Sequence, residues 1–383
     1  MIILTLVRII KKTVNLKYSG QMKKSNKINK LSLAILTTTL LIVAITQVQA
    51  QTKPLKAETL DSVKIAVEAF KLINLPDPTF KPFQPPLPMD STQIADMGFE
   101  QVYQSEPFSY FMRDGKKLFA QKFSYSSNTT IILLHGVLSS SYIMNRTAGL
   151  LRESTKAEVI ALDFRGHGQS EGIAADVDYI DQYTDDLIDV ISTIKKNKPK
   201  GKIIIAGHSM GGGIALRYAM KKNAPLVDGY LFFAPLLGHN SPTFQKSSTT
   251  ADTTTEPFLK IHIERIIGLS MYNSIGVHKY DSLPVLFFNL PKEMPLNKYT
   301  YRSNRSMAPE DYKAGLKAVK APLLVIVGSK DAAFVASEFR PAVQKNSKGK
   351  VIVIEGATHD GIRHNKKAME EVKTWFQKYY NLK

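Results

Sequence analysis

The sequence predicts an α/β fold in which a mostly parallel, doubly wound sheet carries helices on both faces. Three observations point to it: short apolar runs alternate with amphipathic stretches, a hairpin pattern precedes the first apolar run, and a glycine-rich turn joins a strand to a helix. Continuous apolar runs are typical of strands buried on both faces, and strand–helix repeats favour parallel crossovers. In such sheets, functional sites form outside the carboxyl ends of the strands.

The pattern begins after an N-terminal helix and a proline-rich connector. Apolar residues three or four apart predict the helix between Leu60 and Ile73, and the prolines of 75–88 exclude a helix or a central strand there. Residues 109–123 hold two short strands around an Asp-Gly turn, which predicts a hairpin. The strands expected next are 129–136, 158–170 with its loop, 203–206, 227–235, 321–331 and 349–360. The helices expected between and after them are 147–153, 180–195, 214–219 and 366–380.

One segment, 236–320, interrupts the alternation with more chain than one crossover needs. It opens with a Ser/Thr-rich loop, and apolar residues then predict one helix and a second apolar wall. A plain surface insertion is the alternative, but the apolar content favours a cap over the site. The expected organisation is 1–50 upstream extension and signal peptide, 51–108 N-terminal helix and connector, 109–235 first part of the core, 236–320 cap, and 321–383 second part of the core.

The N-terminal 50 residues have the pattern of a secretory signal. A lysine-rich stretch from Met22 precedes an apolar run from Leu31 to Ile45, and small residues at Val48 and Ala50 suit cleavage. A membrane anchor, the alternative, needs about 20 apolar residues, more than this run offers. We therefore expect an exported protein, periplasmic or secreted, that begins near Gln51.

The charge and the amino-acid composition exclude several classes of function. Residues 1–50 carry eight basic and no acidic residues, so the net charge of +18 falls to about +10 without them. No dense basic tract remains to suggest nucleic acid, and the run 363–367 is expected to be a solvated surface that allows at most transient contact with anionic membranes. The sequence has no cysteine, which excludes disulfides, cysteine nucleophiles and cysteine metal sites. No paired-histidine motif indicates a metal, and no cofactor is expected.

The glycine-rich turn has the spacing of a nucleophile elbow. Gly207, Ser209 and Gly211 follow an apolar strand and precede a helix, where a serine takes a strained conformation and glycines let strand and helix approach. A flexible turn and a phosphate loop are the alternatives, but no Lys-Ser/Thr follows the glycines. Ser209 can act as a nucleophile only if a general base, and an acid that orients this base, lie beside it.

Two residues at the ends of later strands supply both. His359 ends the last strand and Asp331 the strand before it, so both emerge at the sheet edge where Ser209 lies. The chain order Ser, Asp, His is that of an α/β-hydrolase. Other histidines next to glycines, His135, His167 and His208, are expected to make structural hydrogen bonds.

The oxyanion of an acyl-transfer intermediate needs two N–H donors. One is the N–H of Met210, directly after the nucleophile. The other belongs to the loop after the strand that ends at Gly136, where Val137 is favoured and Leu138 remains open.

Six motifs carry a resemblance to a known family. They are HGVLSSS (135–141), LDFRGHGQSEG (162–172), GHSMGGGIALRYA (207–219), LFFAPLLG (231–238), GSKD (328–331) and GATH (356–359). Together they resemble the monoglyceride lipase, lysophospholipase and serine aminopeptidase-like branch of the α/β-hydrolases over about residues 109–383. The resemblance implies Ser209 as nucleophile, His359 as base, Asp331 as acid, and Val137 with Met210 as oxyanion hole. It implies nothing about 236–320.

The expected activity is hydrolysis of carboxylic esters with apolar acyl groups, such as monoacylglycerols or lysophospholipids. Four cap residues are candidates to line the acyl site: Phe258, Ile266, Phe287 and Phe288. An aminopeptidase is the alternative, because a peptide amine would find carboxylates in the cap: Glu256, Glu264, Asp281, Glu293 and Glu310. A non-catalytic binding protein is disfavoured by the intact Ser, Asp and His. The sequence does not indicate an oligomeric state.

Overall fold

The computed structural model describes residues 57–81, 91–244 and 256–380. The expected signal segment 1–50, most of the Ser/Thr-rich loop and part of the proline-rich connector lie outside the described residues. Two compact units are distinguished, Met1–Ile65 and Ala66–Lys383. Helix α3 (Ala57–Ile73) covers the described part of the first unit and continues into the second. All that follows concerns the second unit.

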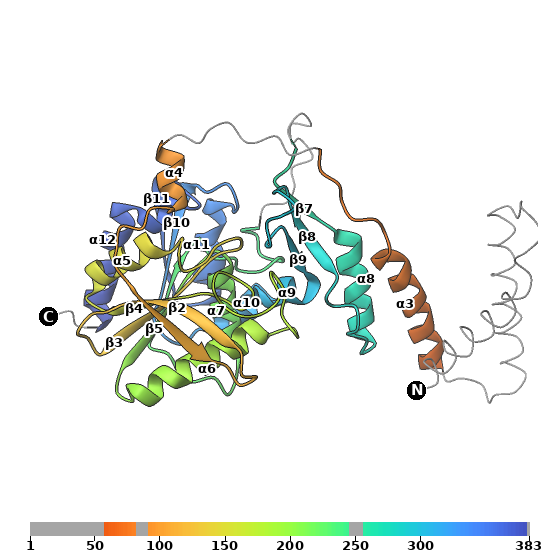
Figure 1. Ribbon diagram of the computed structural model, residues 1–383, viewed down its shortest axis with the longest axis horizontal. Helices are drawn as coiled ribbons and strands as arrows, with labels where there is room; N and C mark the ends of the chain where they lie inside the picture. Colours follow the sequence, from red (N-terminus) through yellow and green to blue (C-terminus); the bar gives the residue numbers. More distant parts are fainter. Residues whose placement is uncertain (1–56, 82–90, 245–255, 381–383) are drawn as a thin grey trace, which may run out of the picture. The chain divides into compact units, whose positions relative to one another are not determined.

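An eight-stranded sheet forms the centre of this unit, with strand order β1-β2-β4-β3-β5-β6-β10-β11 (Figure 1). Its strands are β1 (Glu106–Phe111), β2 (Lys117–Phe123), β3 (Thr129–Leu134), β4 (Glu158–Leu162), β5 (Lys202–His208), β6 (Gly229–Phe233), β10 (Leu323–Lys330) and β11 (Lys350–Thr358). The hairpin β1–β2 is antiparallel and joins β4 antiparallel, whereas all pairs from β4 to β11 are parallel. The expected mostly parallel sheet is therefore confirmed, and parallel pairing brings the ends of β3, β5, β10 and β11 to one edge.

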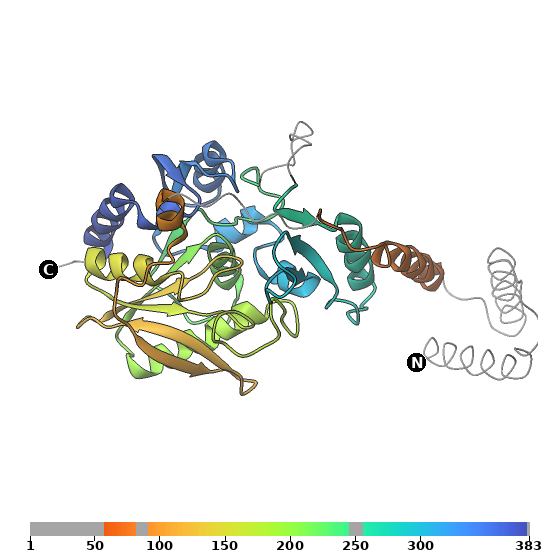
Figure 2. The same ribbon diagram turned by 45° about the horizontal axis from the view of Figure 1, so that its top comes forward.

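Helices cover both faces of the sheet (Figure 2). The pair α5 (Asn145–Thr155) and α12 (Lys366–Tyr380) contact each other, whereas α6 (Gln182–Asn197), α7 (Met210–Met220), α10 (Tyr312–Ala318) and α11 (Phe339–Asn346) form a second contacting group. Short elements complete the core: α4 (Ser91–Met97), η1 (Ala336–Glu338) and η2 (Gly361–His364). Helices α4, α10 and α11 were not predicted from the sequence.

The interrupting segment contains a small antiparallel sheet of its own, with order β7-β8-β9. Its elements are β7 (Leu259–Ile261), α8 (Ile263–Ser274), β8 (Pro284–Phe288), β9 (Lys298–Thr300) and α9 (Tyr301–Ser306). We call residues 256–306 the cap; it lies beside the core (Figures 1 and 2). The following helix α10 contacts α7 and α11, so the last part of 236–320 lies with the core helices.

The end of the cap is bound to the core through Asp176. This buried carboxylate accepts hydrogen bonds from Arg302 Nη2 at 2.6 Å, Arg302 Nε at 2.8 Å and Thr300 Oγ1 at 2.6 Å. Hydrogen bonds to charged groups contribute more than neutral ones, about 1.5–3 kcal/mol each in mutational series. The β9–α9 end of the cap is therefore anchored on the core loop that precedes α6.

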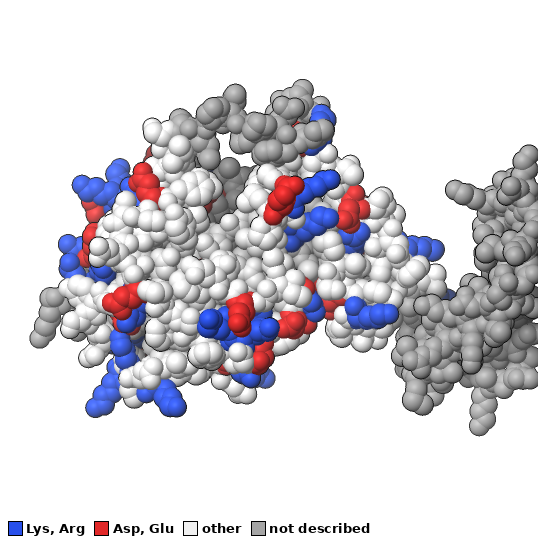
Figure 3. Space-filling model, viewed as in Figure 1, with Lys and Arg blue, Asp and Glu red and all other residues white. Residues whose placement is uncertain are grey.

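Basic and acidic side chains are interspersed on the face shown in Figure 3. None of the helices in the described ranges combines the length and the apolar character needed to span a membrane.

Candidate active site

Ser209 lies in the expected elbow between β5 and α7, with φ 51° and ψ −115°. This is a region that residues with a Cβ seldom occupy. The two flanking glycines are needed: a Cβ at Gly207 would lie 2.5 Å from the nitrogen of Gly212, and one at Gly211 would lie 2.5 Å from the carbonyl oxygen of Leu134. The elbow therefore brings the strand, the helix and the end of β3 closer together than other residues would permit.

His359 and Asp331 form the second part of the site. Nδ1 of His359 lies 2.8 Å from Oδ2 of Asp331, and because a carboxylate only accepts, Nδ1 carries the hydrogen. The other oxygen of Asp331 accepts from the backbone N–H groups of Ala333 and Phe334, both at 2.8 Å. The Asp331 side chain is fully buried, so its orientation and that of the imidazole are fixed.

His208 links this pair to the elbow. Its Nε2 lies 3.0 Å from the carbonyl oxygen of His359, and the two rings are 4.7 Å apart. Ser209 Oγ and Nε2 of His359 make no hydrogen bond within the described chain, so both are available. Catalytic hydrogen bonds are often long in the absence of substrate. The three residues expected to act together thus meet at one sheet edge.

Burial holds the pKa of His208 well below its usual range, and the charge of Arg363 lowers it further. His208 therefore remains neutral at neutral pH and does not repel a positive charge that forms on the neighbouring His359. Its role is to hold the backbone of the loop that carries His359.

Two backbone N–H groups close to Ser209 in the chain or in space are the candidates for an oxyanion hole. In the described chain neither Val137 nor Met210 donates its N–H to a protein acceptor, whereas Leu138 donates its N–H to Tyr299 Oη at 2.9 Å. Gly136 brings the loop close, since a Cβ there would lie 3.3 Å from Cβ of Ser209. The N-terminus of α7 adds a favourable dipole for an anion. Of the two loop candidates, Val137 is the one with a free donor.

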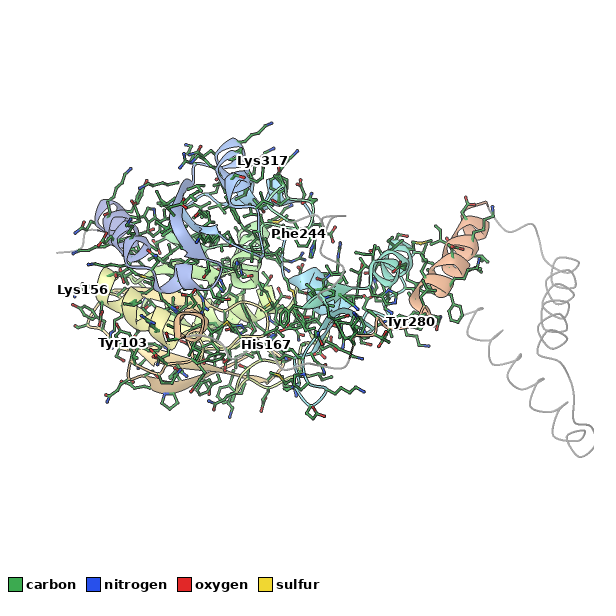
Figure 4. The ribbon with its side chains drawn as sticks, turned by 90° about the horizontal axis from the view of Figure 1, so that it is seen from above. Tyr103, Lys156, His167, Phe244, Tyr280 and Lys317 are labelled. Atoms are coloured by element: carbon green, nitrogen blue, oxygen red, sulfur yellow. The ribbon has the colours of Figure 1, made fainter. Side chains whose placement is uncertain are left out.

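The buried histidines next to glycines are structural. Nδ1 of His135 contacts the Gly136 carbonyl at 2.7 Å, and its Nε2 accepts from the N–H of Phe164 at 3.1 Å. His167 lies on the side of the core that faces the cap (Figure 4). Burial lowers the pKa of His135 to about 4 and that of His167 to about 3.

The expectation that 363–367 is a solvated run is wrong at its first residue. The Arg363 side chain is 1% exposed and donates to Asp360 Oδ1 at 2.7 Å and to the carbonyl oxygen of Asp96. It fills the space beneath the loop that carries His359. A run of charges in a sequence does not reveal that one of them points inward.

The four apolar cap candidates lie in different places. Phe258 is more than half exposed, and Ile266 is half-buried on α8. Phe288 is buried and packs on Tyr299, with ring centroids 5.7 Å apart. Phe287 lies on the opposite face of the cap sheet, paired with Lys298, whose ammonium is 5.2 Å from its ring. Phe288, not Phe287, therefore shares the face of Tyr299 that is turned toward the core.

Five carboxylates were candidates to bind the amine of a peptide substrate. Four of them are already paired with cations or histidines of the cap region. Glu256 contacts Lys260, Glu264 contacts His262, Asp281 contacts His278, and Glu310 contacts Arg305. Glu293 is exposed. No group of three or more potential metal ligands occurs among the residues that the structure describes.

Two residues that contact the site loops, Tyr299 and Asp96, are not among those predicted from the sequence. Tyr299 binds Leu138, and Asp96 accepts from Thr358 Oγ1 at 2.8 Å, next to His359. Neither lies in a motif, and each contact joins segments more than 150 residues apart.

The family described as "Serine aminopeptidase, S33" matches residues 126–365. Among curated proteins, YugF of Bacillus subtilis, an uncharacterized hydrolase, is 29% identical over 160 residues, 42% of this chain and 54% of YugF. The monoglyceride lipase of Rattus norvegicus is 24% identical over 277 residues, 68% of this chain and 87% of the lipase. The chain thus spans about half the length of the first relative and most of the second.

Solved structures share the fold. The α/β hydrolase GrgF from Penicillium superimposes with a TM-score of 0.52 at 14% identity, covering 73% of this chain and 100% of GrgF. Est1E from Butyrivibrio proteoclasticus, solved with ferulic acid, gives a TM-score of 0.51 at 18% identity, covering 70% of this chain and 98% of Est1E.

Proposed function

Because the chain belongs to the serine aminopeptidase (S33) family of α/β-hydrolases, we propose that it is a serine hydrolase that cleaves carboxylic esters through an acyl-enzyme on Ser209. The observation that carries the proposal is that a strained, partly exposed serine and a His359 bound to the buried Asp331 lie at one sheet edge. His208, next to Ser209, contacts His359. A serine hydroxyl is a weak nucleophile until a base removes its proton, and an oriented imidazole provides that base.

The reaction follows from these positions. Ser209 Oγ forms a bond to the carbonyl carbon while its proton passes to Nε2 of His359. The carbon–oxygen bond to the alcohol then breaks, and the leaving oxygen takes the proton from His359. Water next attacks the acyl carbon and gives a proton to His359, which returns it to the departing Ser209 oxygen as the acid is released. Asp331 stabilises the imidazolium throughout.

We assign the oxyanion hole to the N–H groups of Val137 and Met210. Both are free of protein acceptors, and together they would bind the negative oxygen of each tetrahedral intermediate. Loss of one such donor costs about 2.7–4 kcal/mol in other acyl-transfer enzymes.

For the substrate we propose esters with apolar acyl groups, such as monoacylglycerols or lysophospholipids. Of the four cap candidates, Phe288 lies on the Tyr299 face of the cap sheet, which is turned toward the core. Burial of each methylene of an acyl chain contributes about 0.8 kcal/mol. An aminopeptidase activity is less well supported, because four of the five candidate carboxylates already have basic partners. The monoglyceride lipase among the relatives agrees with the ester proposal.

The first experiment tests the nucleophile. A fluorophosphonate should label the purified protein stoichiometrically, and Ser209→Ala should abolish the label. Ser209→Ala, His359→Ala and Asp331→Asn should each lower kcat by about four to six orders of magnitude without changing the circular dichroism spectrum. The losses should not add, because the three groups act as a unit. Near-wild-type activity in purified Ser209→Ala would refute the assignment.

The second experiment tests the substrate class. We expect kcat/KM for p-nitrophenyl esters to rise with acyl length from acetate to decanoate and to exceed that for aminoacyl amides. Faster cleavage of the amides, or no gain with acyl length, would leave a serine hydrolase but reject the lipid-like substrate.

Export is proposed from the sequence of residues 22–50 alone. N-terminal sequencing of the protein from the producing cell should find Gln51 or a neighbour at the start. An intact segment 1–50 on the exported protein would contradict the cleavage and favour the membrane anchor.

A further inference from the structure

One hydroxyl of the cap is fully buried and contacts the core. Tyr299 on β9 is 0% exposed, and its ring packs between Phe288 of the cap and His167 of the core. Its Oη lies 2.9 Å from the backbone nitrogen of Leu138 and 3.0 Å from Nε2 of His167. Leu138 directly follows Val137, to which we assigned an oxyanion donor. Tyr299 therefore connects the cap to the oxyanion loop.

The direction of each hydrogen bond is determined. Nδ1 of His167 lies 3.0 Å from the carbonyl oxygen of Arg165, which can only accept, so Nδ1 carries the hydrogen. In the neutral ring Nε2 is then an acceptor, so the Tyr299 hydroxyl donates to His167. The same oxygen accepts from the N–H of Leu138. A phenylalanine at this position would leave both partners unpaired.

Leu138 needs such a support. Its φ is 58°, a left-handed conformation that costs a non-glycine residue energy and persists only where neighbouring contacts enforce it. Within the described chain, the bond to Tyr299 is the one hydrogen bond formed by Val137, Leu138 or Ser139. Leu138 and Ser139 also border a cavity of about 390 Å³, whose other side includes Pro295 and Leu296 of the cap. Packing on that side is therefore incomplete.

We propose that Tyr299 is a positioning residue that holds the oxyanion loop in its active conformation. The bond fixes the peptide between Val137 and Leu138, which limits rotation about ψ of Val137. The adjoining Gly136–Val137 peptide, which carries the Val137 N–H, is thereby restricted to one orientation beside Ser209. The cap thus completes the oxyanion hole without contacting the substrate's carbonyl. The catalytic part of this inference rests on the proposed function.

The test removes the hydroxyl alone. Tyr299→Phe keeps the ring contacts that fold the cap, and we expect kcat for p-nitrophenyl butyrate to fall about 10- to 100-fold with KM within about twofold. Full loss of an oxyanion donor lowers kcat by about 10²–10³, and a misplaced donor should lose part of that. Tyr301→Phe is the matched control, because its hydroxyl is also in the cap but contacts Ser270 Oγ at 3.0 Å.

Two further measurements separate positioning from a general structural effect. The affinity for an alkyl trifluoromethyl ketone, whose Ser209 adduct carries an oxyanion, should fall by the same factor as kcat/KM. Amide hydrogen exchange of Leu138, whose N–H loses its acceptor, should accelerate at least tenfold in Tyr299→Phe and stay unchanged in Tyr301→Phe.

Unchanged kcat in Tyr299→Phe would overturn the inference, as would equal losses in the two variants. Wild-type protein without esterase activity would instead refute the proposed function. Hydrogen exchange would then still test whether the Tyr299 hydroxyl holds Leu138. Unchanged exchange in Tyr299→Phe would overturn that part of the inference.

Discussion

At the scale of single residues, two of the strained backbone positions are Ser209 and Leu138. Both are non-glycine residues with positive φ, and both lie beside the space where the carbonyl of the substrate is proposed to react. Backbone strain of this kind costs about 1–3 kcal/mol per residue and is retained where the surroundings enforce it. At this site the strain lowers stability but orients the Ser209 hydroxyl and the N–H groups of the oxyanion loop.

The strain predicts an unusual stability order among inactive variants. Ser209→Gly should be more stable than Ser209→Ala by about 1 kcal/mol, since glycine tolerates φ 51° and alanine does not. Glycine in an ordinary position would have the opposite effect, because it adds entropy to the unfolded chain. Urea unfolding of the two variants checks the order, and a less stable glycine variant would show that the elbow is not strained.

The sequence allowed the candidate triad to be predicted, because each residue follows a strand and strand ends meet at one edge. Tyr299 could not be predicted. Its role depends on a cap sheet whose outer strands have three residues each, too few to show a periodic pattern. Arg363 was misassigned for a related reason: its burial arises from the packing of distant segments.

At the scale of elements, the hairpin and the six parallel strands were predicted from their apolar runs and turns. The helices α4, α10 and α11 were not, since each has eight residues or fewer. Helix α4 matters most for the site. Its Asp96 accepts from Thr358 Oγ1, which in turn accepts from the N–H of Gly361 at 2.9 Å. An element outside the matched family region thus supports the loop of the proposed base.

Thr358 offers a test of this support. Thr358→Val should lower the free energy of unfolding by about 1–3 kcal/mol, because it leaves a carboxylate and an N–H without their partner. It should also lower kcat several-fold, because His359 is the next residue. Thr358→Ser keeps the hydroxyl and serves as the control in urea unfolding and ester hydrolysis. Equal behaviour of the two variants would mean that α4 does not position His359.

At the scale of the whole molecule, buried histidines make stability depend on pH. The pKa of His135 is lowered to about 4 and that of His167 to about 3, so the folded state binds fewer protons than the unfolded state below pH 6.5. Their contribution is present above pH 6.5 and is lost as pH falls toward the folded values.

We therefore expect the free energy of unfolding to decrease between pH 6.5 and pH 5, by roughly 1.5 kcal/mol for each of the two histidines. Asp186 opposes this slope in part, because burial raises its pKa to about 6 and its folded state therefore binds more protons than its unfolded state in this window. Denaturant unfolding at four pH values measures it. A flat profile would indicate that these rings are protonated in the folded protein.

The anchoring of β9 and α9 bears on how caps can be exchanged between related hydrolases. A laboratory chimera, or a natural recombination, that replaced 256–306 as one cassette would also remove Tyr299, Thr300 and Arg302. It would leave the buried carboxylate of Asp176 without Arg302 and Thr300, and the N–H of Leu138 without the Tyr299 hydroxyl. A transplantable cassette would have to end before Lys298, so that the acceptor molecule keeps its own last strand. In this protein the last strand of the cap sheet and the core loops that it contacts would therefore have to be exchanged together.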